Sequence, residues 1–197
     1  GPSVAGKSSL LNALAGYSQI ANGHILWQKV PLHTMAASAR PIATLFQDNN
    51  FFPHLTIERN LALAITQWLW LTIKQKTLIQ GALASTGLSG LEDRLPSKLS
   101  GGEQGRAALA RILLQNKPIL LLDEPFSALG PALKDEMLDL IARIADEKKL
   151  LIFLVTHEPK DALRIASKTI AVIDGKVLAP IPTKVALDKK SGPLSKY

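Results

Sequence analysis

Cysteine is absent from the 197 residues of the chain, which excludes disulfides, thiol chemistry and every metal site built on cysteine ligands. Charged residues are not abundant either: they make up 20% of the chain, against 47% for apolar residues. This balance is typical of a globular protein and excludes a disordered one. A chain of this length can bury a sizeable core, so we expect one domain with room for an inserted lobe.

Long apolar runs are also missing. The longest apolar stretch, residues 61–71, is interrupted by Thr66 and Gln67 and is too short to cross a bilayer. No secretory signal peptide is visible. We therefore expect a cytosolic protein that associates with a membrane only through a partner.

The net charge of +7 comes from 23 basic and 16 acidic residues. Apart from Lys148, Lys149 and the C-terminal segment, the lysines are scattered along the chain. The excess therefore predicts a solvated surface with a weak preference for a membrane or a nucleotide, and we expect no nucleic-acid partner.

The first eight residues, Gly-Pro-Ser-Val-Ala-Gly-Lys-Ser, fit the spacing G-x-x-x-x-G-K-[ST] of a phosphate-binding loop. Glycines let successive backbone N–H groups turn toward an anion, and a helix that begins near Gly6 adds the positive end of its dipole. Lys7 is expected to reach the β- and γ-phosphates, and Ser8 to place its hydroxyl on Mg²⁺. The alternative is a glycine-rich turn that caps a helix. The predicted phosphate-binding residues are Gly1, Pro2, Ser3, Val4, Ala5, Gly6, Lys7, Ser8 and Ser9.

A buried parallel strand normally precedes such a loop and positions it. The sequence starts with the first glycine of the loop, and residue 1 is not methionine. We therefore expect this sequence to be an N-terminally incomplete form of a longer protein.

Strands and helices alternate along the rest of the chain, which predicts an α/β fold with a mostly parallel sheet. Continuous apolar runs predict buried strands at 42–46, 119–122 and 150–155. Helical patterns occupy 7–15, 55–87, 100–115 and 131–145. In the second of these regions we expect Trp68 and Trp70 to be packing residues. Residues 167–178 predict a hairpin, and the segment from 179 on is expected to be a loose tail.

Polar side chains lie at or just beyond the carboxyl ends of these three strands, where open parallel sheets bind their ligands. Asp123 can hold Mg²⁺ there, and Glu124 can orient or deprotonate an attacking water. Gln47 can ligate Mg²⁺ or water through its amide oxygen, and a neutral His157 can donate a hydrogen bond to a γ-phosphate. Each of these residues, taken alone, is also compatible with a structural role.

The sequence Ser-Gly-Gly-Glu at 100–103 has two interpretations. It is a capping box, in which Ser100 caps a helix and Glu103 reaches back to it. The two glycines also make an open group of N–H donors for phosphate oxygens at a helix start. One chain does not need two phosphate cradles for one nucleotide, so Ser100, Gly101 and Gly102 are expected to serve a nucleotide held by another subunit.

These motifs have the order and spacing found in ATP-binding-cassette ATPases, and the sequence resembles that family over essentially its whole length. Residues 1–8, 47, 99–103, 119–124 and 157 match the Walker A, Q-loop, signature, Walker B and H-switch motifs. Within the family, residues 45–50 and 121–129 are most similar to the ATP-binding subunit of bacterial thiamine importers. The resemblance implies a P-loop NTPase fold with an inserted α-helical lobe, whose N-terminal antiparallel strands and first core strand are missing here.

The resemblance also implies a division of the chain. The ATP-binding core would comprise 1–46 and 101–180, the helical lobe with the Q-loop and signature motif 47–100, and the loose tail 181–197. Two such subunits would form a head-to-tail homodimer around two ATP molecules. The implied catalytic residues are Glu124 as general base, Gln47 as sensor of the γ-phosphate and His157 as stabiliser of the transition state; the implied Mg²⁺ ligands are Ser8, Gln47 and Asp123.

Such a subunit works with transmembrane permease subunits, and indirectly with a periplasmic substrate-binding protein, at the cytoplasmic face of the bacterial inner membrane. The implied cargo is thiamine or its phosphates. The departures from the family pattern include Val4, which replaces a glycine, and Gly130, which replaces the D-loop aspartate. These departures leave open a degenerate cassette that binds ATP as a regulator. A soluble cassette ATPase acting in DNA repair or translation is the other alternative.

Overall fold

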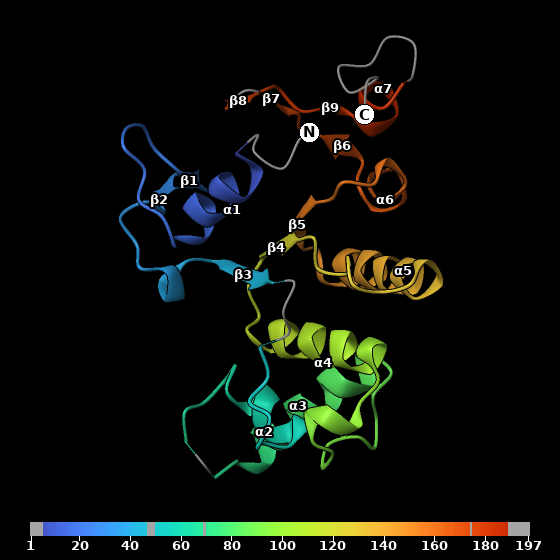
Figure 1. Cartoon of the computed structure of the whole chain (residues 1–197). Coiled ribbons are helices and arrows are strands. Elements are labelled where there is room, and N and C mark those ends of the chain that lie inside the picture. The colour runs from blue at the N-terminus through green and yellow to red at the C-terminus, as the bar shows by residue number, and fades with distance from the viewer. Residues whose placement is uncertain (1–5, 47–49, 69, 174, 189–197) are drawn as a thin grey trace.

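The computed structural model describes residues 6–46, 50–68, 70–173 and 175–188. Its centre is a three-stranded sheet in the order β3-β4-β5, with all strands parallel (Figure 1). The strands are β3 (Ile42–Leu45), β4 (Ile119–Asp123) and β5 (Leu151–Val155). The predicted α/β class with a parallel sheet is therefore confirmed, and each observed strand begins and ends within one residue of its prediction.

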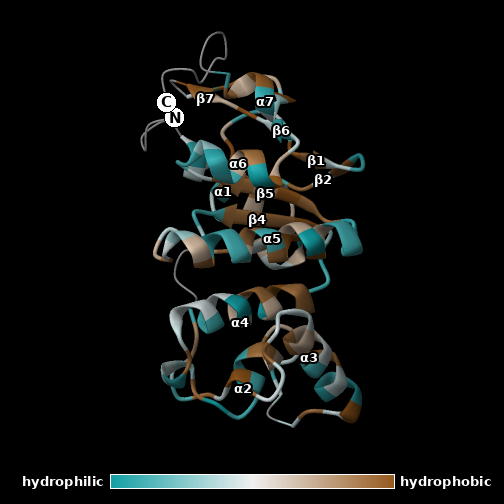
Figure 2. Ribbon diagram, turned by 90° about the vertical axis from the view of Figure 1, so that its right-hand side faces the viewer, coloured by the Kyte–Doolittle hydropathy of each residue, from teal (hydrophilic) through white to brown (hydrophobic). Residues whose placement is uncertain are grey.

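Helices cover both faces of this sheet. They are α1 (Lys7–Ala15), α4 (Gly101–Leu114) and α5 (Pro131–Lys148). On one face, Ile119 and Leu121 of β4 pack with Leu11 of α1. On the other face, Leu120 and Leu122 pack in a core supplied by α4 and α5. Figure 2 shows the hydrophobic strands between α1 on one side and α5 on the other. A strand buried on both faces needs an unbroken apolar run, which is why the sequence predicted β4 so directly.

A second core lies between α4 and two further helices, α2 (Ile57–Ala62) and α3 (Ile73–Ser85). The face of α4 that carries Ala107 and Ala110 belongs to this core, while Ala108 and Leu109 face the sheet. Helix α4 therefore joins the helical lobe to the sheet. Asn60 is fully buried here, and its amide group binds backbone atoms of the loop 52–56 that enters α2.

The prediction for Trp68 and Trp70 was wrong. Helix α2 ends at Ala62, and α3 begins only at Ile73. The two indole rings lie between these helices and are 75% and 86% exposed. The helical pattern predicted from 55 to 87 is therefore interrupted, and these two side chains do not pack in a core.

Short elements complete the chain. They are β1 (Leu26–Trp27), β2 (Val30–Pro31), the 3₁₀ turns at Ala37–Ala39 and Pro96–Lys98, α6 (Pro159–Ile165), β6 (Lys168–Thr169), β7 (Val172–Ile173), β8 (Lys176–Val177), β9 (Ile181–Pro182) and α7 (Thr183–Ala186). The hairpin within 167–178 is present as the antiparallel pair β7–β8. No helix among the described residues is long and apolar enough to cross a membrane.

The prediction of a loose tail was wrong for residues 181–188. Strand β9 pairs with β6, and α7 follows directly. The hydroxyl of Thr183 is buried and donates to the carbonyl of Ala166 at 2.7 Å, and Ala186 is buried as well. Prolines and lysines suggested disorder, but a few buried side chains are enough to order this segment. Residues 189–197 lie outside the described part.

Candidate functional site

Helix α1 begins at Lys7, as the motif predicted. Gly6 precedes it with a φ of 90°, a left-handed conformation that glycine adopts without strain. Lys7, Ser8 and Ser9 form the first turn, where backbone N–H groups have no partner within the helix. The predicted phosphate ligands Gly1, Pro2, Ser3, Val4 and Ala5, and the predicted Gln47, lie outside the described residues, so their roles stay predictions.

The other end of α1 is held by a side chain that sequence reasoning missed. Arg40 is buried, and its guanidinium donates to the carbonyls of Ala13 at 2.6 Å and Leu14 at 2.7 Å. A cation at this position satisfies the last carbonyls of the helix and opposes the negative end of its dipole. Arg40 also leaves no room for a side chain at the left-handed Gly16, which ends the helix.

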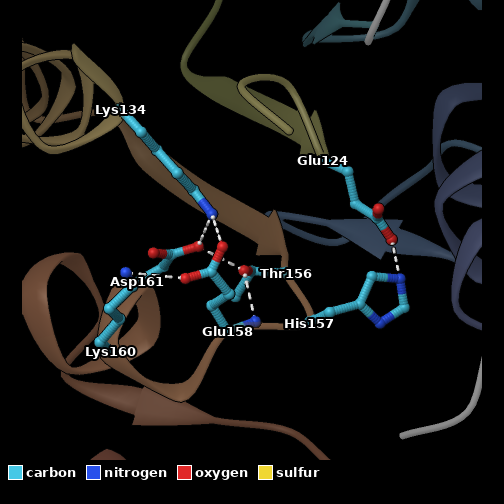
Figure 3. Close-up of polar contacts among 7 residues, drawn as sticks. All are labelled: Glu124, Lys134, Thr156, His157, Glu158, Lys160 and Asp161. Carbon is cyan, nitrogen blue, oxygen red and sulfur yellow. Dashed lines mark hydrogen bonds and ion pairs between the residues drawn. The ribbon is translucent and has the colours of Figure 1, made fainter. Parts of the chain in front are cut away.

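Glu124 and His157 come together at the carboxyl end of the sheet, as predicted, and Lys7 lies beside them. Glu124 follows β4 with a φ of 48°, and its backbone N–H donates to the carbonyl of Val155 at 3.1 Å. Its carboxylate contacts Nε2 of His157 (Figure 3). Nδ1 of the same imidazole lies 3.4 Å from the Lys7 ammonium, across a sequence separation of 150 residues. Asp123, the last residue of β4, lies directly before this group.

These contacts constrain the hydrogen bonds that the imidazole can make. A carboxylate only accepts hydrogen bonds and an ammonium only donates them. An imidazole between the two satisfies both when Nε2–H donates to Glu124 and Nδ1 accepts from Lys7. The cluster thus combines a cation, a hydrogen-bond donor and a carboxylate base, which are the groups that phosphoanhydride hydrolysis needs.

The predicted capping box at the start of α4 is present in full. Ser100 accepts the N–H of Glu103, and the Glu103 carboxylate accepts the N–H of Ser100 at 2.7 Å. The backbone and side-chain hydrogen bonds from Ser100 hold the pKa of Glu103 below its usual value. The capping interpretation is thereby confirmed, and the N–H groups of Gly101 and Gly102 remain at the helix start.

Ser100, Gly101 and Gly102 are not brought to the cluster of Lys7, Glu124 and His157. Helix α4 packs on one face of the sheet and α1 on the other. Within one chain, the two predicted phosphate cradles therefore lie in different layers.

Three further residues surround the site and were missed by sequence reasoning: Lys134, Thr156 and Asp161. Figure 3 shows them beside His157, joined by hydrogen bonds and ion pairs. The signal that could have found two of them is their position, since Thr156 precedes His157 directly and Asp161 follows it by one helical turn. Lys134, on the distant helix α5, has no local signal.

Comparison with known proteins identifies a matching family and similar proteins. The family model for ABC transporters matches residues 1–127. "Thiamine import ATP-binding protein ThiQ" of Ruegeria sp. (strain TM1040) is 48% identical over 197 residues, which is 100% of this chain and 85% of that protein. The protein of the same name from Cereibacter sphaeroides is 53% identical over 183 residues, 93% of this chain and 79% of its own.

Solved structures agree with this assignment. The "Dimeric Structure of MJ0796, a Bacterial ABC Transporter Cassette" matches with a TM-score of 0.77 and 26% identity, over 92% of this chain and 82% of that one. A second structure of MJ0796, bound to ADP and Pi in a post-hydrolysis state, matches equally well. The fold, the motifs and the relatives lead to one conclusion: the chain belongs to the ABC transporter family and is one of its ATP-hydrolysing cassettes.

Proposed function

We propose that this cassette drives the import of thiamine, or of its phosphates, as the ATPase subunit of a bacterial transporter. The observation that carries the proposal is the similarity of the whole chain to proteins named as thiamine import ATP-binding proteins. The subunit works at the cytoplasmic face of the inner membrane, bound to transmembrane permease subunits that receive the solute from a periplasmic binding protein. No contact with nucleic acid is part of this function.

Two copies of the chain form the working enzyme. The placement of Ser100–Gly102 and the Lys7 cluster in different layers supports this, because each cradle needs its counterpart from a second chain. The first turn of α1 and the loop before it bind the phosphates of ATP, with Lys7 as the cation. The N–H groups at the start of α4 of the partner close the site from the other side.

Hydrolysis is assigned to the side chains at the carboxyl end of the sheet. Glu124 orients and deprotonates the attacking water, and His157 donates a hydrogen bond to the γ-phosphate. The contact between these two side chains in this structure supports a shared role, because it places base and donor at one point. Gln47 is assigned the sensing of the γ-phosphate.

The donor atoms fit Mg²⁺ at this edge. Ser8 offers a hydroxyl and Asp123 a carboxylate, both hard oxygen ligands, and Gln47 is the third proposed ligand. In nucleotide sites Mg²⁺ takes few protein ligands and the rest from phosphates and water. When bound, it neutralises charge on the β- and γ-phosphates.

The test is ATP hydrolysis by the reconstituted transporter, supplied with the binding protein and thiamine. We expect thiamine to stimulate hydrolysis, and Glu124→Gln to lower kcat by about 100-fold or more, because the base is lost. Glu147→Gln makes the same chemical change at an exposed position on α5 and should leave kcat unchanged.

Equal rates for the wild type and Glu124→Gln would contradict the catalytic assignment and favour a regulatory cassette that only binds ATP. Normal hydrolysis without any response to thiamine would contradict the proposed cargo.

A further inference from the structure

A network of ion pairs and hydrogen bonds includes the two residues that flank His157. The ammonium of Lys134 is 2.6 Å from Oδ2 of Asp161 and 2.8 Å from Oε1 of Glu158. The hydroxyl of Thr156 donates to the same Oδ2 of Asp161 at 2.6 Å. Lys160 binds the other carboxylate oxygen of Glu158 at 3.0 Å. Figure 3 shows that these side chains lie on the opposite side of the backbone from the His157 imidazole.

The centre of this network is buried, although it is made of charges. Asp161 is 2% exposed and the Lys134 side chain 12%. Burial works against the charge of Lys134, but hydrogen bonds to Asp161 and Glu158 outweigh it and raise the pKa of the ammonium. A buried carboxylate that loses its cation leaves an uncompensated charge, so the pair fixes its surroundings in one arrangement.

The residues on both sides of His157 belong to this network. Thr156, before it, is bound to Asp161, and its hydroxyl also accepts the N–H of Glu158 at 3.0 Å. Glu158, after it, is bound to Lys134 through its carboxylate. The His157 side chain itself is 45% exposed, so packing restrains it weakly. The backbone on either side, together with the contacts to Glu124 and Lys7, therefore sets where the imidazole lies.

Lys134 lies near the start of α5. The same helix also contacts the start of α4, where Gly102 lies. An added Cβ at Gly102 would lie 2.7 Å from a methyl group of Leu133, the residue before Lys134. The first turns of α5 thus touch the glycines of α4 on one side and hold the loop of His157 on the other.

We propose that Lys134, with Asp161 and Thr156, positions His157 for ATP hydrolysis. Lys134 does not touch the nucleotide; it is a positioning residue that acts through the backbone at 156 and 158. The inference rests on the hydrolytic function proposed above and adds to it a residue on another helix. The test must distinguish this positioning role from a purely structural role of Lys134.

The experiment measures kcat and KM for ATP in the reconstituted transporter. Lys134→Met should lower kcat roughly tenfold and change KM by less than about twofold, because a displaced imidazole affects the chemical step and not ATP binding. Lys134→Arg retains charge and donors and should restore kcat to within about twofold of the wild type. Thr156→Val cuts the link to Asp161 without leaving Asp161 unpaired with Lys134, and should also lower kcat at constant KM. If Lys134→Met does not fold, the Thr156→Val variant is used for the test instead.

A double-mutant comparison then tests the route through the histidine. In a His157→Ala background, Lys134→Met and Thr156→Val should cause no further loss of kcat, since there is no imidazole to position. The inference is overturned if these variants fold and keep the wild-type kcat, or if they lower kcat by the same factor without His157. The proposed function fails separately, by equal rates of the wild type and Glu124→Gln.

Discussion

The two ends of this molecule that are proposed to bind phosphate are built in opposite ways. At the carboxyl end of the sheet, Lys7, Glu124 and His157 come from three elements and meet only because the strands and α1 pack together. At the start of α4, Ser100 and Glu103 satisfy each other within one helical turn. The group at the sheet forms only when the whole fold is present. The capping box would form in almost any protein in which this helix forms.

This difference divides the work between the two ends. The charged side chains of the proposed catalytic group are at the end that depends on long-range packing; Lys134 lies beside it, and Arg40 holds the opposite end of α1. The other end offers backbone N–H groups and a capped helix, which recognise an anion but cannot move a proton. We infer that removing one of these buried polar side chains lowers the free energy of unfolding more than removing the Ser100 cap of α4 does.

The largest effect is expected for Arg40→Met. The change removes the donors to the carbonyls of Ala13 and Leu14 and to that of Met35, which lies 3.2 Å from Nε. These partly buried carbonyls would lose their charged partner, so the free energy of unfolding should fall by about 3 kcal/mol. Urea unfolding at pH 7 measures this.

Arg143→Met is the matched control for Arg40→Met. Arg143 is exposed; it pairs with Glu147 one turn away on α5 and donates to the exposed carbonyl of Ser85 at 3.3 Å, so its loss should cost less than about 1 kcal/mol. Equal costs at the two positions would show that Arg40 is not a support of α1, and the contrast between the two ends would lose its physical basis.

A smaller effect is expected for Ser100→Ala, which removes the cap of α4 and should cost about 1 kcal/mol at pH 7. The cost depends on pH. Because the folded pKa of Glu103 is lowered, its contribution is present above the unfolded pKa, about 4.3, and is lost as the pH falls through the folded value. The difference between wild type and variant should therefore shrink below about pH 4.

Helix α3 supplies the control for this pH dependence. Thr72 and Gln75 make the same capping box there, with a side chain that does not titrate. Thr72→Ala should cost a similar amount at pH 7 and keep that cost at low pH. A cost of Ser100→Ala that stays constant with pH would mean that Glu103 adds nothing to the cap.

The same contrast explains what the sequence could predict. The capping box, the buried strand β4 and the start of α1 depend on neighbouring residues, and all three were predicted correctly. Glu124 and His157 were found because the ends of parallel strands share one edge of the sheet. Arg40 and Lys134 act on partners more than twenty residues away in the chain, and no local pattern marks them. Trp68 and Trp70 were misplaced because apolar spacing alone cannot show where α2 ends.

Gly130 offers the smallest and most specific change. It caps α5 in an extended conformation, with φ at −62°, but has no side chain to accept a hydrogen bond. An added Cβ would meet no atom within 4 Å. Gly130→Asp gives α5 the kind of local cap that α4 has, and should raise the free energy of unfolding by a few tenths of a kcal/mol, about 0.5 at most.

Gly130→Asn separates the hydrogen bond from the charge. The two variants should have equal free energies of unfolding at high salt, and the aspartate variant should be slightly more stable at low salt. A loss of stability in both would show that the start of α5 is held by Lys134 and Leu133 in a way that a local cap disturbs, so that the two kinds of support compete within one helix.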